Sequence, residues 1–178
     1  IVDCMWLKKE GATEADYEAL ATEVRDTVGI DISLEGIYNW ILFPASKMDP
    51  RIPTANRYVG WYENNEIKIR GIEIRRRDTP VFIKRMQGEM LKILGEAKNT
   101  AQIERLVPAT LAKAGEFVAD LRAGRADPLE LVIRRHLTRE ANEYTTNTAN
   151  ATATKALDEA GIHLQPGEMV DYVIVDMS

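Results

Sequence analysis

The amino-acid sequence predicts an α+β fold in two parts: an antiparallel sheet with one helix packed on a face in residues 1–78, and a mainly helical unit in residues 79–178. Residues 1–78 contain short runs rich in Ile, Val, Tyr and Trp, separated by turn sequences, which is typical of strands. Residues 79–178 contain longer apolar stripes at helical spacing, with capping residues before them. The pattern changes at Thr79-Pro80, where we expect the boundary between the two parts.

The composition indicates a globular protein from a reducing compartment. Hydrophobic residues make up 45% of the chain, which is ordinary for a protein with a packed core. The single cysteine, Cys4, excludes an internal disulfide and favours an intracellular, cytoplasmic location. No apolar run is long enough to cross a membrane and no signal peptide is evident, so we expect no membrane partner. Because the first residue is Ile1 rather than Met, we expect the chain to be a piece of a longer protein.

The basic residues are concentrated in one stretch of an acidic chain, whose formal net charge is −5. Residues 1–50 carry four basic and ten acidic side chains, whereas residues 51–92 carry ten basic and five acidic ones. A local positive band can bind a polyanion even when the whole chain is negative.

The first elements are defined by local signals. Residues 1–7 are mostly apolar and predict a buried strand, in which Asp3 is costly unless it is paired, hydrogen-bonded or bound to a metal. Thr13 and Asp16 form a capping-box pattern before an apolar stripe at helical spacing, and Gly29 ends the helix.

Two hairpins are predicted after this helix. Residues 30–34 alternate as a strand, and residues 37–43 are expected to be its partner. Residues 57–62 and 66–74 form a second pair of predicted strands, and Asn64-Asn65 between them is a favourable hairpin turn.

Residues 70–78, which we call the arginine segment, join the last predicted strand to the first helix of the second part. Four of its residues are arginines: Arg70, Arg75, Arg76 and Arg77. The residues alone allow two interpretations. The first is a solvated charge run paired with Glu73 and Asp78, and the second is a grip on a phosphate chain. Composition alone favours the first.

Start signals in the second part are Thr79-Pro80, Thr100 and Asp127-Pro128, which are expected to cap three helices. Residues 145–154 are small and polar and predict a loop leading into a last helix, and residues 169–175 predict a closing strand.

Four motifs stand out along the chain: Val2-Asp3-Cys4, Asn56-Arg57-Tyr58-Val59-Gly60, the arginine segment with its pattern Arg-Gly-x-Glu-x-x-Arg-Arg-Asp, and Leu137-Thr138-Arg139 through Tyr144. In order and spacing they resemble motifs of family B DNA polymerases, the archaeal ones in particular. In that family the corresponding motifs are the second metal-site motif, the Lys-x-Tyr strand, the palm-to-thumb junction and a thumb motif.

The resemblance implies that residues 1–78 form the C-terminal part of a palm and residues 79–178 a thumb. It implies that the intact protein is a DNA-directed DNA polymerase using two Mg²⁺ ions. Its partners would be primer–template duplex DNA, deoxynucleoside triphosphates and, in addition, a sliding clamp. The other metal motif and the nucleotide-gripping helix of the fingers are missing from this sequence, so we expect these residues alone not to polymerise.

The resemblance also implies roles for individual residues. Asp3 would be the catalytic residue and metal ligand, although Ile1 stands where the family has the first of two aspartates. The residues implied to bind DNA are Asn56, Arg57, Tyr58, Arg70, Arg77, Arg139 and Tyr144. Asn56 stands where lysine is usual, and Arg57 or Lys47 could compensate for the lost charge.

The arginines of the segment are not expected to act alike. Along a strand, alternation would send Arg75 and Arg77 to one side and Arg76 to the other. We therefore assign Arg77 and Arg70 to the DNA backbone, and Arg76 to a bracing pair with Glu73 or Asp78.

Two other hypotheses remain open. The first is a non-catalytic polymerase relative that binds DNA without polymerising, which Ile1 and Asn56 favour. The second is an unrelated α+β binding or assembly module whose arginines pair with its own acids. Salt-dependent binding to duplex DNA would separate the second hypothesis from a polymerase, and activity of the intact protein would separate the first.

Overall fold

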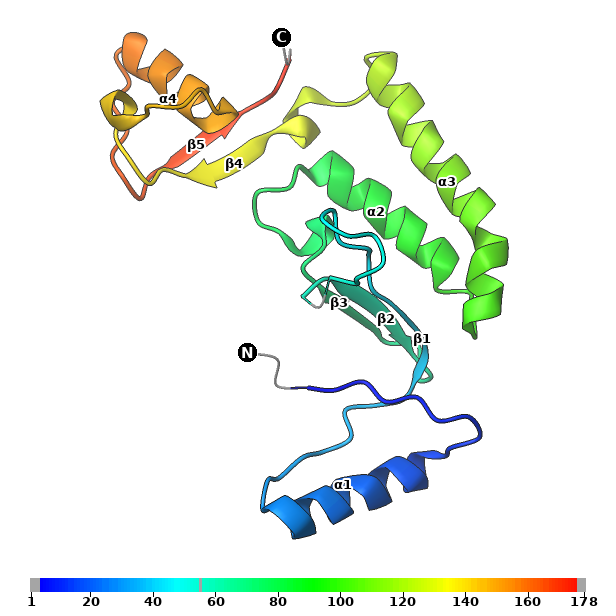
Figure 1. Ribbon diagram of the computed structural model, residues 1–178. Helices are drawn as coiled ribbons and strands as arrows, with labels where there is room; N and C mark the ends of the chain where they lie inside the picture. Colours follow the sequence, from blue (N-terminus) through cyan, green and yellow to red (C-terminus); the bar gives the residue numbers. More distant parts are fainter. Residues whose placement is uncertain (1–3, 55, 176–178) are drawn as a thin grey trace.

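The computed structural model describes residues 4–54 and 56–175 and has a mixed α/β fold of small antiparallel sheets and helices (Figure 1). This confirms the predicted fold class. In chain order the helices and strands are α1 (Glu14–Val28), β1 (Tyr38–Leu42), β2 (Tyr58–Tyr62), β3 (Ile67–Arg70), α2 (Val81–Leu94), α3 (Thr100–Arg122), β4 (Ile133–His136), α4 (Ala149–Glu159) and β5 (Met169–Tyr172). Three short 3₁₀ turns join them: η1 (Glu73–Arg75), η2 (Pro128–Leu131) and η3 (Ala141–Glu143).

The main hydrophobic core lies between a three-stranded sheet and the α2–α3 helix pair. The antiparallel sheet has the order β1-β2-β3, and Figure 1 shows α2 between it and α3. Trp40 and Val59 from the sheet meet Ala97 and Ile103 from the helical side, and all four are buried. The indole Nε1 of Trp40 donates a hydrogen bond to the carbonyl oxygen of Ala97 at 3.2 Å. This core has members on both sides of residue 79, and the palm–thumb boundary placed there stays a prediction.

The predicted hairpin around Asn64-Asn65 is confirmed, but its second strand is shorter than expected. Asn65 has a positive φ of 67°, as tight hairpin turns require, and Tyr58 is paired with Arg70 across the ladder. β3 ends at Arg70 instead of continuing to residue 74. Gly71 follows with a φ of +64°, and a Cβ there would collide with the carbonyl oxygen of Asn56. The chain therefore turns at Gly71 into η1, and the alternation expected for Arg75, Arg76 and Arg77 does not occur.

Helix α1 forms as predicted but does not pack on the sheet. Thr13 and Asp16 make the capping box, and Gly29 ends the helix in the left-handed conformation. No residue of α1 is buried, and Figure 1 shows the helix lying away from the sheet. The prediction of a helix covering a face of the first sheet is wrong, because local capping fixes the helix but the described chain offers it no apolar surface.

Two predicted strands of the first part are absent from the described residues. Residues 4–7, the described part of the first predicted strand, have no regular secondary structure. Residues 30–34 also form no strand, so β1 pairs with β2 instead. The aromatic and glycine residues of β2 provide the better partner, since Gly60 leaves room for the ring of Tyr38.

Two of the three predicted caps are shifted by one residue. The N-cap of α2 is Pro80 rather than Thr79, and it makes no side-chain hydrogen bond. The N-cap of α3 is Asn99, whose side chain accepts from the backbone N–H of Gln102, and Thr100 is the first helical residue. Asp127 caps as predicted, with its carboxylate accepting from the N–H of Leu129, but the element it begins is the short turn η2.

The last part of the chain, which we call the C-terminal lobe (residues 133–175), is less helical than predicted. β4 and β5 form an antiparallel pair, with α4 and η3 packed nearby, and Leu137, Thr154 and Val170 are fully buried. The closing strand predicted at residues 169–175 is confirmed as β5, which is shorter and ends at Tyr172. β4 was not predicted, because Arg134, Arg135 and His136 hide its pattern. In the described ranges no helix has the length and apolar character needed to cross a membrane.

Candidate nucleic-acid interface

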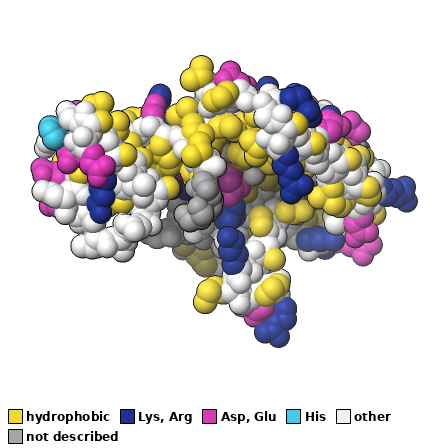
Figure 2. Space-filling model, turned by 90° about the horizontal axis from the view of Figure 1, so that it is seen from above, with side chains coloured by type: hydrophobic (Ala, Val, Ile, Leu, Met, Phe, Trp, Pro, Cys, Tyr) yellow, Lys and Arg dark blue, Asp and Glu magenta, His cyan; other side chains and the backbone are white. Residues whose placement is uncertain are grey.

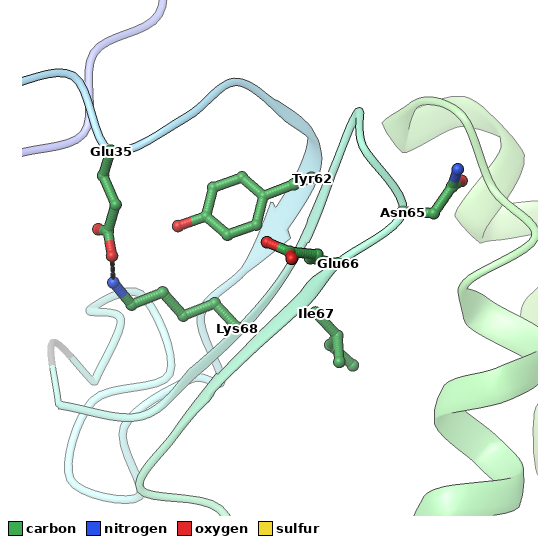
Figure 3. A pocket seen from close by; sticks show the side chains of 6 residues that line it. All are labelled: Glu35, Tyr62, Asn65, Glu66, Ile67 and Lys68. Atoms are coloured by element: carbon green, nitrogen blue, oxygen red, sulfur yellow. Dashed lines mark hydrogen bonds and ion pairs between the residues drawn. The ribbon is translucent and has the colours of Figure 1, made fainter.

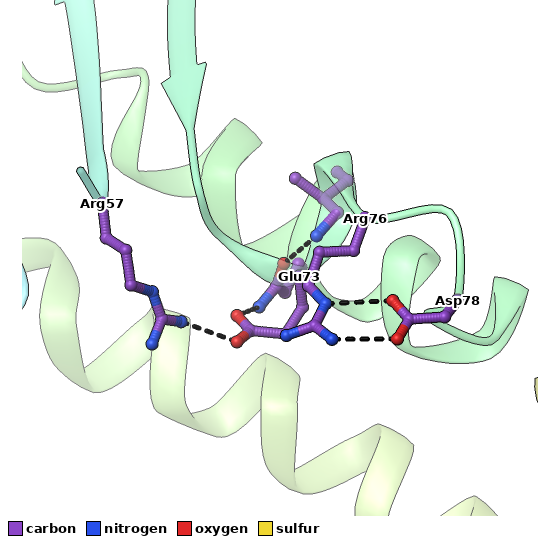
Figure 4. A network of polar contacts seen from close by, with 6 residues as sticks. Arg57, Glu73, Arg76 and Asp78 are labelled. Atoms are coloured by element: carbon purple, nitrogen blue, oxygen red, sulfur yellow. Dashed lines mark hydrogen bonds and ion pairs between the residues drawn. The ribbon is translucent and has the colours of Figure 1, made fainter. Parts of the chain in front are cut away.

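The arginine segment is an irregular turn between β3 and α2 that is tied down by polar contacts (Figure 4). Arg76 donates two hydrogen bonds to the carboxylate of Asp78, at 3.0 Å from Nε and 2.9 Å from Nη2. The predicted bracing pair of Arg76 is thus confirmed, although the segment is not a strand. Arg135 of β4 also contacts Asp78, with 2.7 Å between Nη2 and Oδ2. These contacts, the hydrogen bonds from Arg76 first, lower the pKa of the Asp78 carboxyl to about 2.

A second group of contacts joins three elements around Glu73. Arg57, just before β2, places Nη2 at 2.6 Å from Oε1 of Glu73. Gln87 of α2 donates its amide Nε2 to the other oxygen, Oε2, at 3.0 Å, and accepts from the backbone N–H of Ile74 at 2.7 Å. The hydrogen bond from Gln87, aided by the charge of Arg57, lowers the pKa of Glu73.

The other three arginines of the segment are exposed. Arg70, Arg75 and Arg77 form no ion pair with any residue that the structure describes, in contrast to Arg76. The interpretation as a self-paired charge run is therefore correct for Arg76 alone. Guanidinium groups on a fixed turn are suited to charge-assisted hydrogen bonds with phosphate oxygens.

Tyr58, which the resemblance implied to bind DNA, is buried. It is 5% exposed, and its ring lies at 5.2 Å from the ring of Trp6 and 5.4 Å from that of Phe43, centroid to centroid. Asn56, beside it, is exposed. Two aromatic rings thus pack against Tyr58, and the sequence did not predict Trp6 or Phe43 as its partners.

Arg139 and Tyr144 lie in the C-terminal lobe, between β4 and α4, whereas the arginine segment lies between β3 and α2. Arg139 is exposed, and the hydroxyl of Tyr144 accepts a hydrogen bond from Asn150 at 3.4 Å. The predicted polar loop at residues 145–154 ends early, because Thr148 caps α4 by accepting from the N–H of Ala151. The lobe is linked to the arginine segment through Arg135 and Asp78.

Two partners of the segment were missed from the sequence: Gln87 and Arg135. Gln87 had a detectable signal, since it shares a helical face with Ile83, Met90 and Leu94 and is a polar residue on an otherwise apolar stripe. Arg135 had none, because its contact with Asp78 depends on how β4 lies beside the segment.

The predicted metal ligand, Asp3, lies outside the described residues. Within residues 4–54 and 56–175, no group of three or more His, Cys, Asp or Glu side chains is placed to hold a metal ion. The residues that the structure describes therefore do not form a fitting site for Mg²⁺.

The surface offers open pockets and mixed charge. One pocket of about 570 Å³ is lined by Glu35, Tyr62, Asn65, Glu66, Ile67 and Lys68, and Figure 3 shows Glu35 and Lys68 pointing toward each other as an ion pair. None of the predicted site residues lines it. Another pocket, of about 390 Å³, lies between the arginine segment and the C-terminal lobe, with Arg76, Asp78 and Arg135 in its wall. Basic and acidic side chains are interspersed over the face in Figure 2, and this face shows no broad positive surface.

The fold and the arginine segment define a mixed α/β protein with exposed guanidinium groups on a braced turn. The family profile described as DNA polymerase family B matches residues 15–178. The chain therefore belongs to DNA polymerase family B.

The similar proteins of known name agree with the assignment to DNA polymerase family B. The chain is 25% identical to the DNA polymerase of Archaeoglobus fulgidus over 173 residues, which is 97% of this chain and 20% of the relative. It is 27% identical to DNA polymerase 2 of Aeropyrum pernix over 157 residues, covering 88% of this chain and 18% of the relative. Its fold is similar to that of the family B DNA polymerase from Pyrobaculum calidifontis, with a TM-score of 0.63 and 24% identity over 96% of this chain and 20% of that structure. The chain spans about a fifth of the length of these relatives.

Proposed function

We propose that this chain is the C-terminal part of the palm and the thumb of a DNA-directed DNA polymerase, and that it grips primer–template duplex DNA during nucleotide addition. Family membership supports the proposal, since the relatives are named DNA polymerases. The main supporting observation is that Arg70, Arg75 and Arg77 are exposed and form no ion pair among the described residues. Arg76, by contrast, is paired with Asp78 and braces the turn. A fixed turn can meet a phosphate backbone without losing further conformational freedom.

The grip should be independent of DNA sequence and sensitive to salt. Contacts with phosphates release counterions, so the logarithm of the affinity falls linearly with the logarithm of the salt concentration. Such contacts fix position without reading bases. Arg70 and Arg77 are the main contacts in this proposal, with Asn56, Tyr58, Arg139 and Tyr144 as further predicted ones.

The test is binding of the 178-residue chain to a fluorescent DNA duplex, measured by anisotropy over a series of NaCl concentrations. Arg77→Ala should reduce the slope of log affinity against log salt by about one. Arg125→Ala is the matched control, because it removes the same charge from an arginine that is paired with Asp120 at 2.7 Å. Equal slopes for the Arg77→Ala chain and the unchanged chain, or an equal effect of Arg125→Ala, would refute the assignment of Arg77.

Catalysis by the longer polymerase is a separate part of the proposal. Asp3, which lies outside the described residues, would supply one carboxylate ligand for Mg²⁺ in the longer polymerase, whose substrates would be deoxynucleoside triphosphates. A sliding clamp and an intracellular location are proposed on family membership alone. In the longer protein, Asp3→Ala should abolish nucleotide addition and leave duplex binding nearly unchanged, and full activity of this variant would place the metal site elsewhere.

A non-catalytic relative is the second candidate function. It is favoured by Ile1 in place of the first aspartate and by Asn56 in place of lysine. In this case the longer protein would bind duplex DNA with the same salt dependence but add no nucleotides in Mg²⁺.

A further inference from the structure

Arg57 differs from Arg70, Arg75 and Arg77 in being held by a carboxylate. Its Nη2 lies at 2.6 Å from Oε1 of Glu73, and its Nε is buried and has no hydrogen-bond partner among the described residues. An arginine whose charge is already neutralised releases few counterions when DNA approaches. The sequence pattern suggested that Arg57 replaces a DNA-contacting charge, but its guanidinium is held by Glu73 although the side chain is 37% exposed.

The carboxylate of Glu73 is itself fixed from α2. Gln87 donates to Oε2 of Glu73 at 3.0 Å and accepts from the backbone N–H of Ile74 at 2.7 Å, so one amide group holds both the side chain and the backbone of η1 (Figure 4). Half-exposed ion pairs are weak when both side chains are free to move. Here one member is anchored, which lowers the entropy lost when the pair forms.

We propose that Glu73, anchored by Gln87, is a positioning residue that holds Arg57 against η1 and away from DNA phosphates. This inference rests on the proposed DNA grip and deepens it. It leaves Arg70 and Arg77 as the main phosphate contacts of the arginine segment, and Arg57 joins the start of β2 to η1. The contact from Gln87 then couples this arrangement to α2, the first helix after the segment.

The proposal predicts that removing the negative charge of Glu73 makes the affinity for duplex DNA more dependent on salt. Glu73→Gln keeps the shape of the side chain and abolishes its charge, so Arg57 becomes available to a phosphate. The slope of log affinity against log NaCl should then become steeper by about 0.9, the value for one additional phosphate contact on duplex DNA. A purely structural role of Glu73 would lower the melting temperature without steepening this slope.

Three further variants make the test specific. Glu73→Gln combined with Arg57→Met should return the slope to that of the unchanged chain. Glu66→Gln, in the exposed β2–β3 turn, raises the net charge equally and should leave the slope unchanged. Gln87→Met removes the anchor and should give a slope between those of the unchanged chain and Glu73→Gln. Gln87→Met also tests the inference if circular dichroism shows that Glu73→Gln does not fold.

The experiment is the anisotropy titration of the 178-residue chain with duplex DNA described above. The inference is overturned if folded Glu73→Gln and Gln87→Met chains keep the slope of the unchanged chain, or if the increase persists after Arg57→Met. If the unchanged chain shows no salt-dependent binding, the proposed grip fails, and this inference fails with it. The behaviour of the unchanged chain therefore separates failure of the proposed function from failure of the inference alone.

Discussion

Helices α1 and α2 have similar local signals but different surroundings. Each has apolar residues at helical spacing, and each begins at a recognisable start sequence. α2 buries Phe82 and supplies Leu91 and Leu94 to the core, whereas α1 buries none of its residues. The comparison shows that capping and periodicity specify that a helix exists, while burial depends on an apolar partner surface elsewhere in the chain.

The largest expected effect lies in the core beneath α2. Trp40→Ala removes a side chain that is 3% exposed, together with its hydrogen bond to Ala97, and should lower the free energy of unfolding by ~3–5 kcal/mol. Urea denaturation followed by circular dichroism measures this change. Leu111→Ala on the outer face of α3, where Leu111 is 62% exposed, is the control and should change stability by no more than ~0.5 kcal/mol. Similar losses for the two variants would contradict the placement of the core.

Much of this arrangement was predictable where the signals are local. The Asn64-Asn65 hairpin and the capping box at Thr13 depend on neighbouring residues alone and were predicted correctly. The strand near residue 170 was predicted from its own residues, although it pairs with the distant strand β4. The strand expected to reach residue 74 failed because Gly71 adopts a positive φ next to the backbone of Asn56. A close approach of this kind, between residues 15 positions apart, leaves no pattern in the sequence.

The candidate site was predictable to a similar extent. The pairing of Arg76 followed from acids two to three positions away, since Asp78 and Glu73 are its neighbours in the chain. The contacts from Gln87 and Arg135 bridge 14 and 57 positions, respectively, and depend on the packing of α2 and β4. The role of Asp3, outside the described residues, and the DNA contacts of the other site residues stay predictions.

An intermediate effect is expected at Asp78, where polar contacts rather than apolar burial join the arginine segment to the C-terminal lobe. Its pKa is lowered from 3.8 to about 2 by Arg76 and Arg135, so the folded state favours the ionised carboxylate. The stabilisation is therefore complete above the ordinary pKa and is lost as the pH falls from about 4 toward 2. Urea midpoints measured across this range should fall more steeply for the unchanged chain than for Asp78→Asn.

Asp78→Asn should also be less stable at pH 7, since both arginines lose their charged partner. Asp171→Asn, which removes a carboxylate paired with Arg134 of the same strand β4, is a control for a surface pair that does not reach the segment. An equal pH dependence of the unchanged chain and Asp78→Asn below pH 4 would show that the segment is not braced through this carboxylate.

The smallest effect on the free energy of unfolding is expected for apolar residues of α1, the helix that buries none of its residues. Leu20 and Val28 are 38% and 58% exposed, so replacing both with serine removes little buried apolar surface. The free energy of unfolding of the 178-residue chain should change by less than ~0.5 kcal/mol per substitution in urea denaturation. A loss above ~1 kcal/mol at either position would mean that α1 packs against the rest of the chain after all, as a core helix does.

Capping should matter more than these apolar residues: Thr13→Ala removes a capping box and should cost ~1 kcal/mol of local helix stability. That reversed ranking, with a polar cap outweighing two large apolar side chains, is the behaviour that separates α1 from α2.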